Sequence, residues 1–169
     1  MKEKLSIEEI HKLISLMREG FSYLSKLKEK DPVGKHINYF KVPSTLSESI
    51  AIHLLRRQQI LPALSDMTFE HNNKEADIVA KNGDDIVNIE IKATAESAFQ
   101  NLGKKDIQAD YIIWLHFGAY FKDVEQTQIS AYIITKPELY FKEPGKINLS
   151  KLKEMVSDVE TVDIDISKL

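Results

Sequence analysis

The stretch that most constrains the fold of this chain is residues 75–94, which has the pattern of a β-hairpin. Two runs rich in β-branched residues, 77–81 and 86–92, flank the sequence Asn82-Gly83-Asp84-Asp85. Asparagine followed by glycine between alternating apolar runs is the strongest short-range hairpin signal in a sequence. The sequence therefore predicts two antiparallel strands joined by a tight turn.

The length of the turn decides which side chains face each other across the hairpin. Side chains alternate between the two faces of a strand, so a two-residue loop at Asn82-Gly83 pairs Asp77 with Asn88 and leaves Glu90 diagonal to Asp77. A four-residue loop places Glu90 directly opposite Asp77. With either loop Asp77, Glu90 and Lys92 share one face, and only a three-residue loop would separate them. The residues expected on the other face form a wall of the core: Ile78, Ala80, Val87, Ile89 and Ile91.

Composition is that of a globular chain and leaves the function open. The 169 residues fit a single domain, 1–169, with 43% hydrophobic and 29% charged residues. The absence of cysteine excludes disulfides and thiolate chemistry and suits a cytoplasmic location. We expect neither a transmembrane helix nor a signal peptide, because no apolar run approaches the ~20 residues that cross a bilayer. A net charge of −3 excludes a globally basic nucleic-acid binder, so contact with phosphates requires a local patch.

Two amphipathic helices are expected before the hairpin. A capping box at Ser6-Ile7-Glu8-Glu9 opens the first, Gly20 is the place where it could kink, and Asp31-Pro32-Val33-Gly34 ends it. The second should span about residues 46–59 and open with a capping box at Thr45-Leu46-Ser47-Glu48.

The order of elements after these helices predicts an α/β fold with a mixed central β-sheet flanked by helices. The expected organisation is a helical N-terminal part over about 1–60, a core over about 46–117 and a mixed C-terminal part over about 118–169. A strand over 111–117 is nearly all apolar, as expected of a strand buried on both faces. The other expected elements are a strand at 66–71, a helix at 96–105 with Gly103 near its end, a loop with a short helix at 118–128, a strand at 129–135, a helix at 150–156 and a strand at 159–166.

Two carboxylates and a lysine on one face of a hairpin suit a hard cation and a phosphate. Carboxylate oxygens are the ligands that Mg²⁺ prefers, and a metal-bound water can attack phosphorus. Lysine can orient or deprotonate that water, or offset charge in the transition state. The alternative is that Glu90 and Lys92 are solvated residues on the exposed face of an antiparallel sheet, where charged pairs stabilise modestly. The hairpin alone leaves both interpretations open, although Glu90-Ile91-Lys92 is the only acid-x-lysine tripeptide in the chain.

The order of elements over about residues 46–117 resembles that of the PD-(D/E)xK nuclease superfamily, which has the restriction-endonuclease-like fold. A helix carrying an acid precedes three strands, with aspartate on the second and Glu-x-Lys on the third, and a helix and a buried strand follow. The resemblance implies that Asp77, Glu90 and Lys92 are catalytic, that Asp77 and Glu90 bind metal, and that Glu48 is an additional metal-site residue. Glu48 is also explained by the capping box. Ala76 replaces the proline of the motif, so the signature is incomplete.

The function implied by this resemblance is that of a Mg²⁺-dependent DNA endonuclease, a hydrolase of phosphodiester bonds, with Mn²⁺ as a substitute metal. A small type II restriction enzyme cutting duplex DNA as a homodimer would fit, with the first helix as a candidate dimer surface. Gln100 and Lys104, four apart, would share a helix face. Alternatives are a repair or junction-resolving nuclease of the same fold and a non-cleaving nucleic-acid-binding module. A further alternative is a protein-interaction or assembly domain in which the charged residues of the hairpin are surface residues without a catalytic role. The residues expected to contact DNA are Gln100, Asn101, Lys104 and Lys105.

Overall fold

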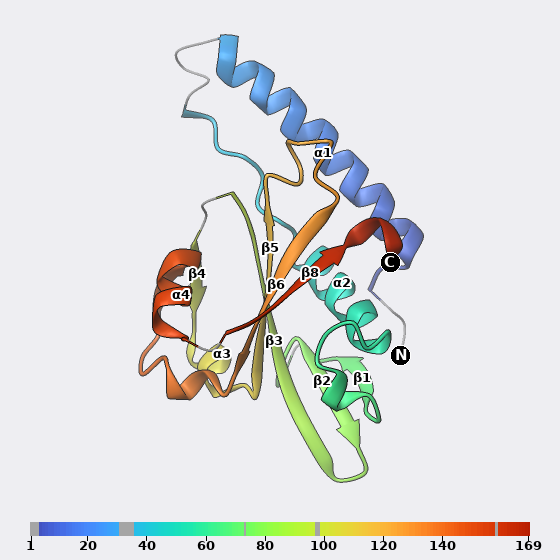
Figure 1. Cartoon of the computed structure of the whole chain (residues 1–169), viewed down its shortest axis with the longest axis vertical. Helices are drawn as coiled ribbons and strands as arrows, with labels where there is room; N and C mark the ends of the chain where they lie inside the picture. The colour runs from blue at the N-terminus through green and yellow to red at the C-terminus, as the bar shows by residue number, and fades with distance from the viewer. Residues whose placement is uncertain (1–3, 31–35, 73, 97–98, 158) are drawn as a thin grey trace.

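A six-stranded β-sheet forms the centre of the molecule (Figure 1). The computed structural model describes residues 4–30, 36–72, 74–96, 99–157 and 159–169. The strands of the sheet are β1 (Thr68–His71), β2 (Ile78–Asn82), β3 (Asp85–Ala95), β5 (Tyr111–Gly118), β6 (Gln128–Thr135) and β8 (Glu160–Asp165). They lie in the order β1-β2-β3-β5-β6-β8, with β3 and β5 parallel and the other neighbours antiparallel. The predicted α/β fold with a mixed central sheet is therefore confirmed.

Helices and a second, smaller sheet cover the two faces of the central sheet. Two longer helices, α1 (Ile7–Lys30) and α2 (Ser44–Arg56), pack on one face. The opposite face carries an antiparallel pair of short strands, β4 (Phe99–Leu102) with β7 (Gly145–Asn148), and the short helices α3 (Lys104–Gln108) and α4 (Leu149–Met155). Short 3₁₀ helices complete the described elements: η2 (Pro62–Leu64), η3 (Pro137–Leu139) and η4 (Ile166–Lys168). None of the helices in the described ranges combines the length and apolarity needed to cross a membrane.

Strand β5 separates two hydrophobic cores. Its odd-numbered residues, Ile113, Leu115 and Phe117, join the core beneath α1 and α2. Its even-numbered residues Ile112 and Trp114 join the core beneath β4, β7, α3 and α4. This division follows from the alternation of side chains along a strand. It confirms the prediction that the apolar run at 111–117 is a strand buried on both faces.

The register of the β2–β3 hairpin is the one that places Glu90 opposite Asp77. Lys81 pairs with Ile86, as a four-residue loop predicts, although the strands continue one pair further and leave only Gly83-Asp84 in the turn. Gly83 has a φ of +60°, a conformation that glycine adopts without the strain of a Cβ atom. The predicted apolar face is confirmed by its contribution to the core beneath α1 and α2: Ile78, Ala80, Ile89 and Ile91 are buried there, and Val87 packs against them.

The start of α1 agrees with the sequence. The Ser6 N–H donates to Glu9 Oε2 at 2.8 Å, and the Glu9 N–H donates to Ser6 Oγ at 3.3 Å, which is the predicted capping box. The helix is continuous through Gly20, where a Cβ atom would lie 2.7 Å from the ring of Phe40. Gly20 thus permits a close side-chain approach within α1. The stretch expected to end this helix, residues 31–34, lies outside the described residues.

The capping box expected at the start of α2 is wrong. The helix begins at Ser44, one residue before Thr45, and its N-cap is Pro43, which has no side-chain acceptor to offer. It also ends at Arg56, three residues earlier than expected, before Gln58 with a φ of +57°. Glu48 therefore lies in the second turn of α2, facing the interior, instead of capping the helix.

The helix expected over residues 96–105 is also wrong. Among the described residues of this stretch, Phe99–Leu102 form strand β4 and Gly103 caps α3, so only Lys104 and Lys105, at the end of the expected helix, are helical. Strand β4 pairs with β7, whose residues lie more than forty positions later in the chain. The residues near β4 therefore do not indicate the strand that stabilises it. The stretch 118–128 contains turns without the short helix that we expected. The expected helix at 150–156 and strand at 159–166 correspond to α4 and β8.

Candidate functional site

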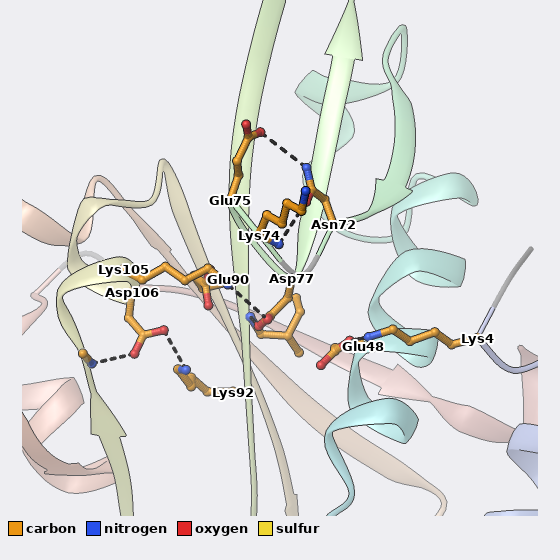
Figure 2. A network of polar contacts seen from close by, with 12 residues as sticks. Lys4, Glu48, Asn72, Lys74, Glu75, Asp77, Glu90, Lys92, Lys105 and Asp106 are labelled. Atoms are coloured by element: carbon orange, nitrogen blue, oxygen red, sulfur yellow. Dashed lines mark hydrogen bonds and ion pairs between the residues drawn. The ribbon is translucent and has the colours of Figure 1, made fainter. Parts of the chain in front are cut away.

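Asp77 and Glu90 meet beside the hairpin through a shared lysine (Figure 2). Asp77 directly precedes β2, and its Oδ2 accepts a hydrogen bond from the Ile91 N–H at 2.9 Å, which fixes the carboxylate against β3. The Nζ of Lys105, on α3, lies 3.1 Å from Glu90 Oε1 and 3.7 Å from Asp77 Oδ1. The two acids that the hairpin register brings face to face are thus bridged by one ammonium group.

Glu90 is a buried carboxylate in an unfavourable electrostatic environment. Its side chain is 3% exposed, and within the described part of the chain its Oε1 atom has no hydrogen-bond partner, although it forms the ion pair with Lys105. Burial, then the charge of Asp77 and a contact with Asp106, raise the pKa of Glu90 to about 8, against the lowering effect of Lys105. For Lys105, burial works to lower the pKa, but Glu90 and Asp77 raise it overall. A cation near Glu90, such as the Lys105 ammonium, therefore favours the ionised form of this side chain.

Lys92 lies on the same face of β3 as Glu90, as predicted, and it is paired with Asp106. The Lys92 Nζ is 2.7 Å from Asp106 Oδ1, and both side chains are largely buried. The other oxygen of Asp106 accepts a hydrogen bond from the Gly103 N–H at 2.7 Å. Asp106 therefore holds the ammonium of Lys92 while it anchors the start of α3.

Asp106 is a site residue that the sequence analysis did not identify. Its spacing from Gly103, three residues before it, is that of an N-cap and its third helical residue, so the pattern carried a weak signal for a helix start at this point. Because we expected a helix over residues 96–105, Gly103 was placed near the end of a helix and its role at the start of α3 was missed.

Glu48 lies on α2 and is buried, and its carboxylate accepts a hydrogen bond from Lys4. Figure 2 shows Lys4 reaching Glu48 from the N-terminal segment. In the parts of the chain that the structure describes, no set of three or more His, Asp, Glu or Cys side chains is arranged to hold a metal ion. The structure thus brings Asp77 and Glu90 together and gives Glu48 a different charged partner.

The four residues expected to contact DNA occupy different environments. Gln100 lies on β4, and its side chain donates to the backbone carbonyl of Ala93. Asn101 and Lys104 are exposed, whereas Lys105 joins the acid pair. The expectation that Gln100 and Lys104 share a helix face is wrong, because one lies on β4 and the other on α3.

The polar face of β3 continues beyond Lys92 to a buried threonine. The Trp114 indole N–H donates to Thr94 Oγ1 at 2.8 Å, and the same hydroxyl is hydrogen-bonded to His116 Nδ1 at 2.9 Å. These bonds join β3 to its parallel neighbour β5 on the face that carries the site. They hold the strand carrying Glu90 and Lys92 in a defined position.

The acid pair fits a hard divalent cation by the chemistry of its donors. Asp77 and Glu90 offer carboxylate oxygens, which Mg²⁺ prefers to nitrogen or sulfur ligands. The Oε1 of Glu90 is buried and already has a cation, the Lys105 ammonium, 3.1 Å away. Lys105 already places a positive charge between the two acids.

Comparison with known proteins identifies no relative. No protein-family model, no curated protein and no solved structure matches the chain.

Proposed function

We propose that this chain is a metal-dependent DNA endonuclease of the restriction-endonuclease-like fold that hydrolyses phosphodiester bonds. The observation that carries the proposal is the meeting of Asp77 and Glu90 at the hairpin, where Glu90 is buried beside a second carboxylate. The element order supports it, because an acid-bearing helix precedes three sequential strands and the third of these pairs in parallel with β5.

In this proposal Asp77 and Glu90 hold Mg²⁺, for which Mn²⁺ can substitute. Bound there, the metal supplies an acidified water and neutralises charge on the phosphate. The Lys92 ammonium donates a hydrogen bond to the attacking water and so orients it, and Asp106 keeps this ammonium in position. Glu48 is the weakest member of the proposed metal site, because Lys4 already neutralises its carboxylate.

The proposed substrate is duplex DNA, cut in the cytoplasm by a homodimer that presents one site to each strand. Helix α1 supports a dimer surface, because Leu16 and Tyr23, seven residues apart and so on one side of the helix, are 54% and 64% exposed. Exposed Asn101 and Lys104 remain our candidates for contacts to the DNA backbone, and Gln100 supports β3 through its bond to the Ala93 carbonyl.

A second candidate, a nucleic-acid-binding module that does not cleave, is favoured by one observation. Lys105 pairs with Glu90 and Asp77, and Lys92 pairs with Asp106, so the acids of the site are already partly neutralised by the protein itself. A site that never exchanges these lysines for metal would bind DNA without hydrolysis.

Digestion of a long DNA of mixed sequence, followed by sequencing of the ends, distinguishes these functions. With Mg²⁺ we expect discrete fragments that share an end sequence, which is the product of a restriction-type enzyme. Scattered nicks would instead favour a repair or junction-resolving nuclease. DNA that is bound but stays intact with Mg²⁺ and with Mn²⁺ would overturn the proposal in favour of the non-cleaving module.

A further inference from the structure

The position of Lys105 sets it in competition with any metal at the acid pair. We infer that Lys105 is the resting counter-ion of Asp77 and Glu90, and that its ammonium must leave these carboxylates when a divalent cation binds. The inference rests on the proposed metal site and adds a residue that sets the metal affinity of that site.

The geometry makes one cation exclude the other. The Lys105 Nζ is 3.1 Å from Glu90 Oε1 and 3.7 Å from Asp77 Oδ1, so it already lies between the oxygens that would hold a metal. Two positive charges sharing the same oxygens repel one another strongly, above all beside a carboxylate that is removed from water. Metal binding must therefore break the Lys105 ion pairs.

The surroundings allow the lysine to leave. The side chain of Lys105 is 41% exposed, whereas that of Glu90 is 3% exposed. A lysine is a point charge on a flexible four-carbon stem, so its ammonium can turn into solvent while the carboxylates stay in place. Asp77 stays because the Ile91 N–H holds it, and Glu90 stays because it is enclosed by the sheet.

Lys92 does not compete in this way, which makes the inference specific to one lysine. Its ammonium is held 2.7 Å from Asp106 Oδ1, and Asp106 is in turn held by the Gly103 N–H. Of the two lysines that the structure places at the site, Lys105 bridges the acid pair and Lys92 is tied to a separate acid.

The chain offers a matched control for a test of this competition. Lys104 directly precedes Lys105 on α3 and is exposed, and the structure shows no ion pair between Lys104 and the acids of the site among the described residues. Replacing either lysine by methionine removes the same charge and keeps a similar stem. Only the Lys105→Met substitution removes the counter-ion.

The test is calorimetric titration of Mg²⁺ into metal-free protein without DNA, at a pH above about 8 where Glu90 is ionised, after circular dichroism has shown that each variant is folded. We expect Lys105→Met to bind Mg²⁺ about tenfold more tightly than wild type, a factor within the usual range of coupling between two ligands. Lys104→Met should bind within about twofold of wild type, because the charge of an exposed lysine is screened by solvent.

The outcomes separate failure of this inference from failure of the proposed function. Equal or weaker Mg²⁺ binding by Lys105→Met, with wild-type protein that does bind Mg²⁺, overturns the competition and leaves the metal site intact. An equal gain in Lys104→Met also overturns it, because the gain would then reflect net charge. Absence of Mg²⁺ binding in all three folded proteins overturns the metal site itself.

Discussion

At Glu90, burial and the charge of Asp77 raise the pKa from its ordinary value of 4.5 to about 8. Below about pH 8 and in the absence of metal, the folded protein therefore keeps a proton on Glu90 that the unfolded chain releases near its ordinary value. Above about pH 8, Glu90 is the carboxylate that Lys105 neutralises. Folding is then linked to proton uptake between these two pKa values, and stability must fall as the pH rises through this window.

Glu90→Gln should remove this pH dependence. Glutamine has a similar shape and no charge to bury, so in EDTA the free energy of unfolding should decrease less between pH 5 and pH 8 than that of the wild type. Chemical denaturation at several pH values measures the difference. Glu70→Gln, which changes a more exposed carboxylate on β1, serves as the control. A wild-type protein whose stability rises over this range would contradict the assignment.

Asp106→Asn should slow DNA cleavage while leaving the fold intact. Asparagine can still accept the Gly103 N–H that Asp106 now accepts, but it loses the charge that holds Lys92. We expect the turnover rate to fall roughly tenfold or more, with little change in the substrate concentration at half-maximal rate, because a misplaced catalytic group mainly affects the chemical step.

The control for Asp106 is Asp110→Asn. Asp110 also accepts a backbone N–H, that of Asn88 at 2.8 Å, and no ion pair of Asp110 is seen in the described ranges. Equal turnover in Asp106→Asn and wild type would show that Asp106 serves only to cap α3.

At the scale of elements, the β2–β3 hairpin determines whether the acid pair forms. Its register places Asp77 opposite Glu90, and a slip of one residue would move Glu90 to the other face of the sheet. The turn Gly83-Asp84 sets this register. The conformation of the turn is therefore part of the site, although it lies at the far end of the hairpin.

Gly83→Ala should destabilise the protein by about 1 kcal/mol. The φ of Gly83 is +60°, and a Cβ atom there would meet no atom within 4 Å, so the cost is conformational and involves no clash. Gly145→Ala in β7 is the control, because its Cβ atom would also meet no atom within 4 Å and its φ is not positive. Equal denaturation midpoints for the two variants would contradict this account of the turn.

Elements whose signals are local could be predicted from the sequence. The Asn82-Gly83 turn and the alternation around it indicate the hairpin and its apolar face, and the run at 111–117 indicates a strand buried on both sides. These predictions hold because the residues that specify each element lie within it.

Elements that depend on distant partners could not be predicted. Strand β4 exists through pairing with β7, and Glu48 is engaged by Lys4, forty-four residues away. The same limit applies inside the site. The alternation along β3 places Lys92 and Glu90 on one face, but only the tertiary structure shows that Lys105 contacts Glu90 while Lys92 contacts Asp106.

At the scale of the whole molecule, the site lies where two layers meet on one face of the sheet. The hairpin supplies Asp77, Glu90 and Lys92, and the covering layer supplies Lys105 and Asp106 through α3. Figure 1 shows α3 and β4 beside β3, on the side of the sheet away from α1 and α2. The five charges therefore assemble only when the hairpin and the covering layer are both folded.

The central claim is that this assembled site cleaves DNA with a metal held by Asp77 and Glu90. The most direct measurement is the rate at which purified protein converts supercoiled plasmid to nicked or linear DNA, in Mg²⁺ and in EDTA, for wild type, Asp77→Asn and Glu75→Gln. Glu75 lies two residues before Asp77, is exposed, and accepts a hydrogen bond from Asn72, so it is a matched acid outside the site.

We predict cleavage by wild type and Glu75→Gln in Mg²⁺, none in EDTA, and a rate for Asp77→Asn that is lower by more than about a hundredfold, since a catalytic metal is worth several kcal/mol. Cleavage by Asp77→Asn at the wild-type rate, or plasmid left intact by folded wild-type protein in Mg²⁺ and in Mn²⁺, would contradict the claim.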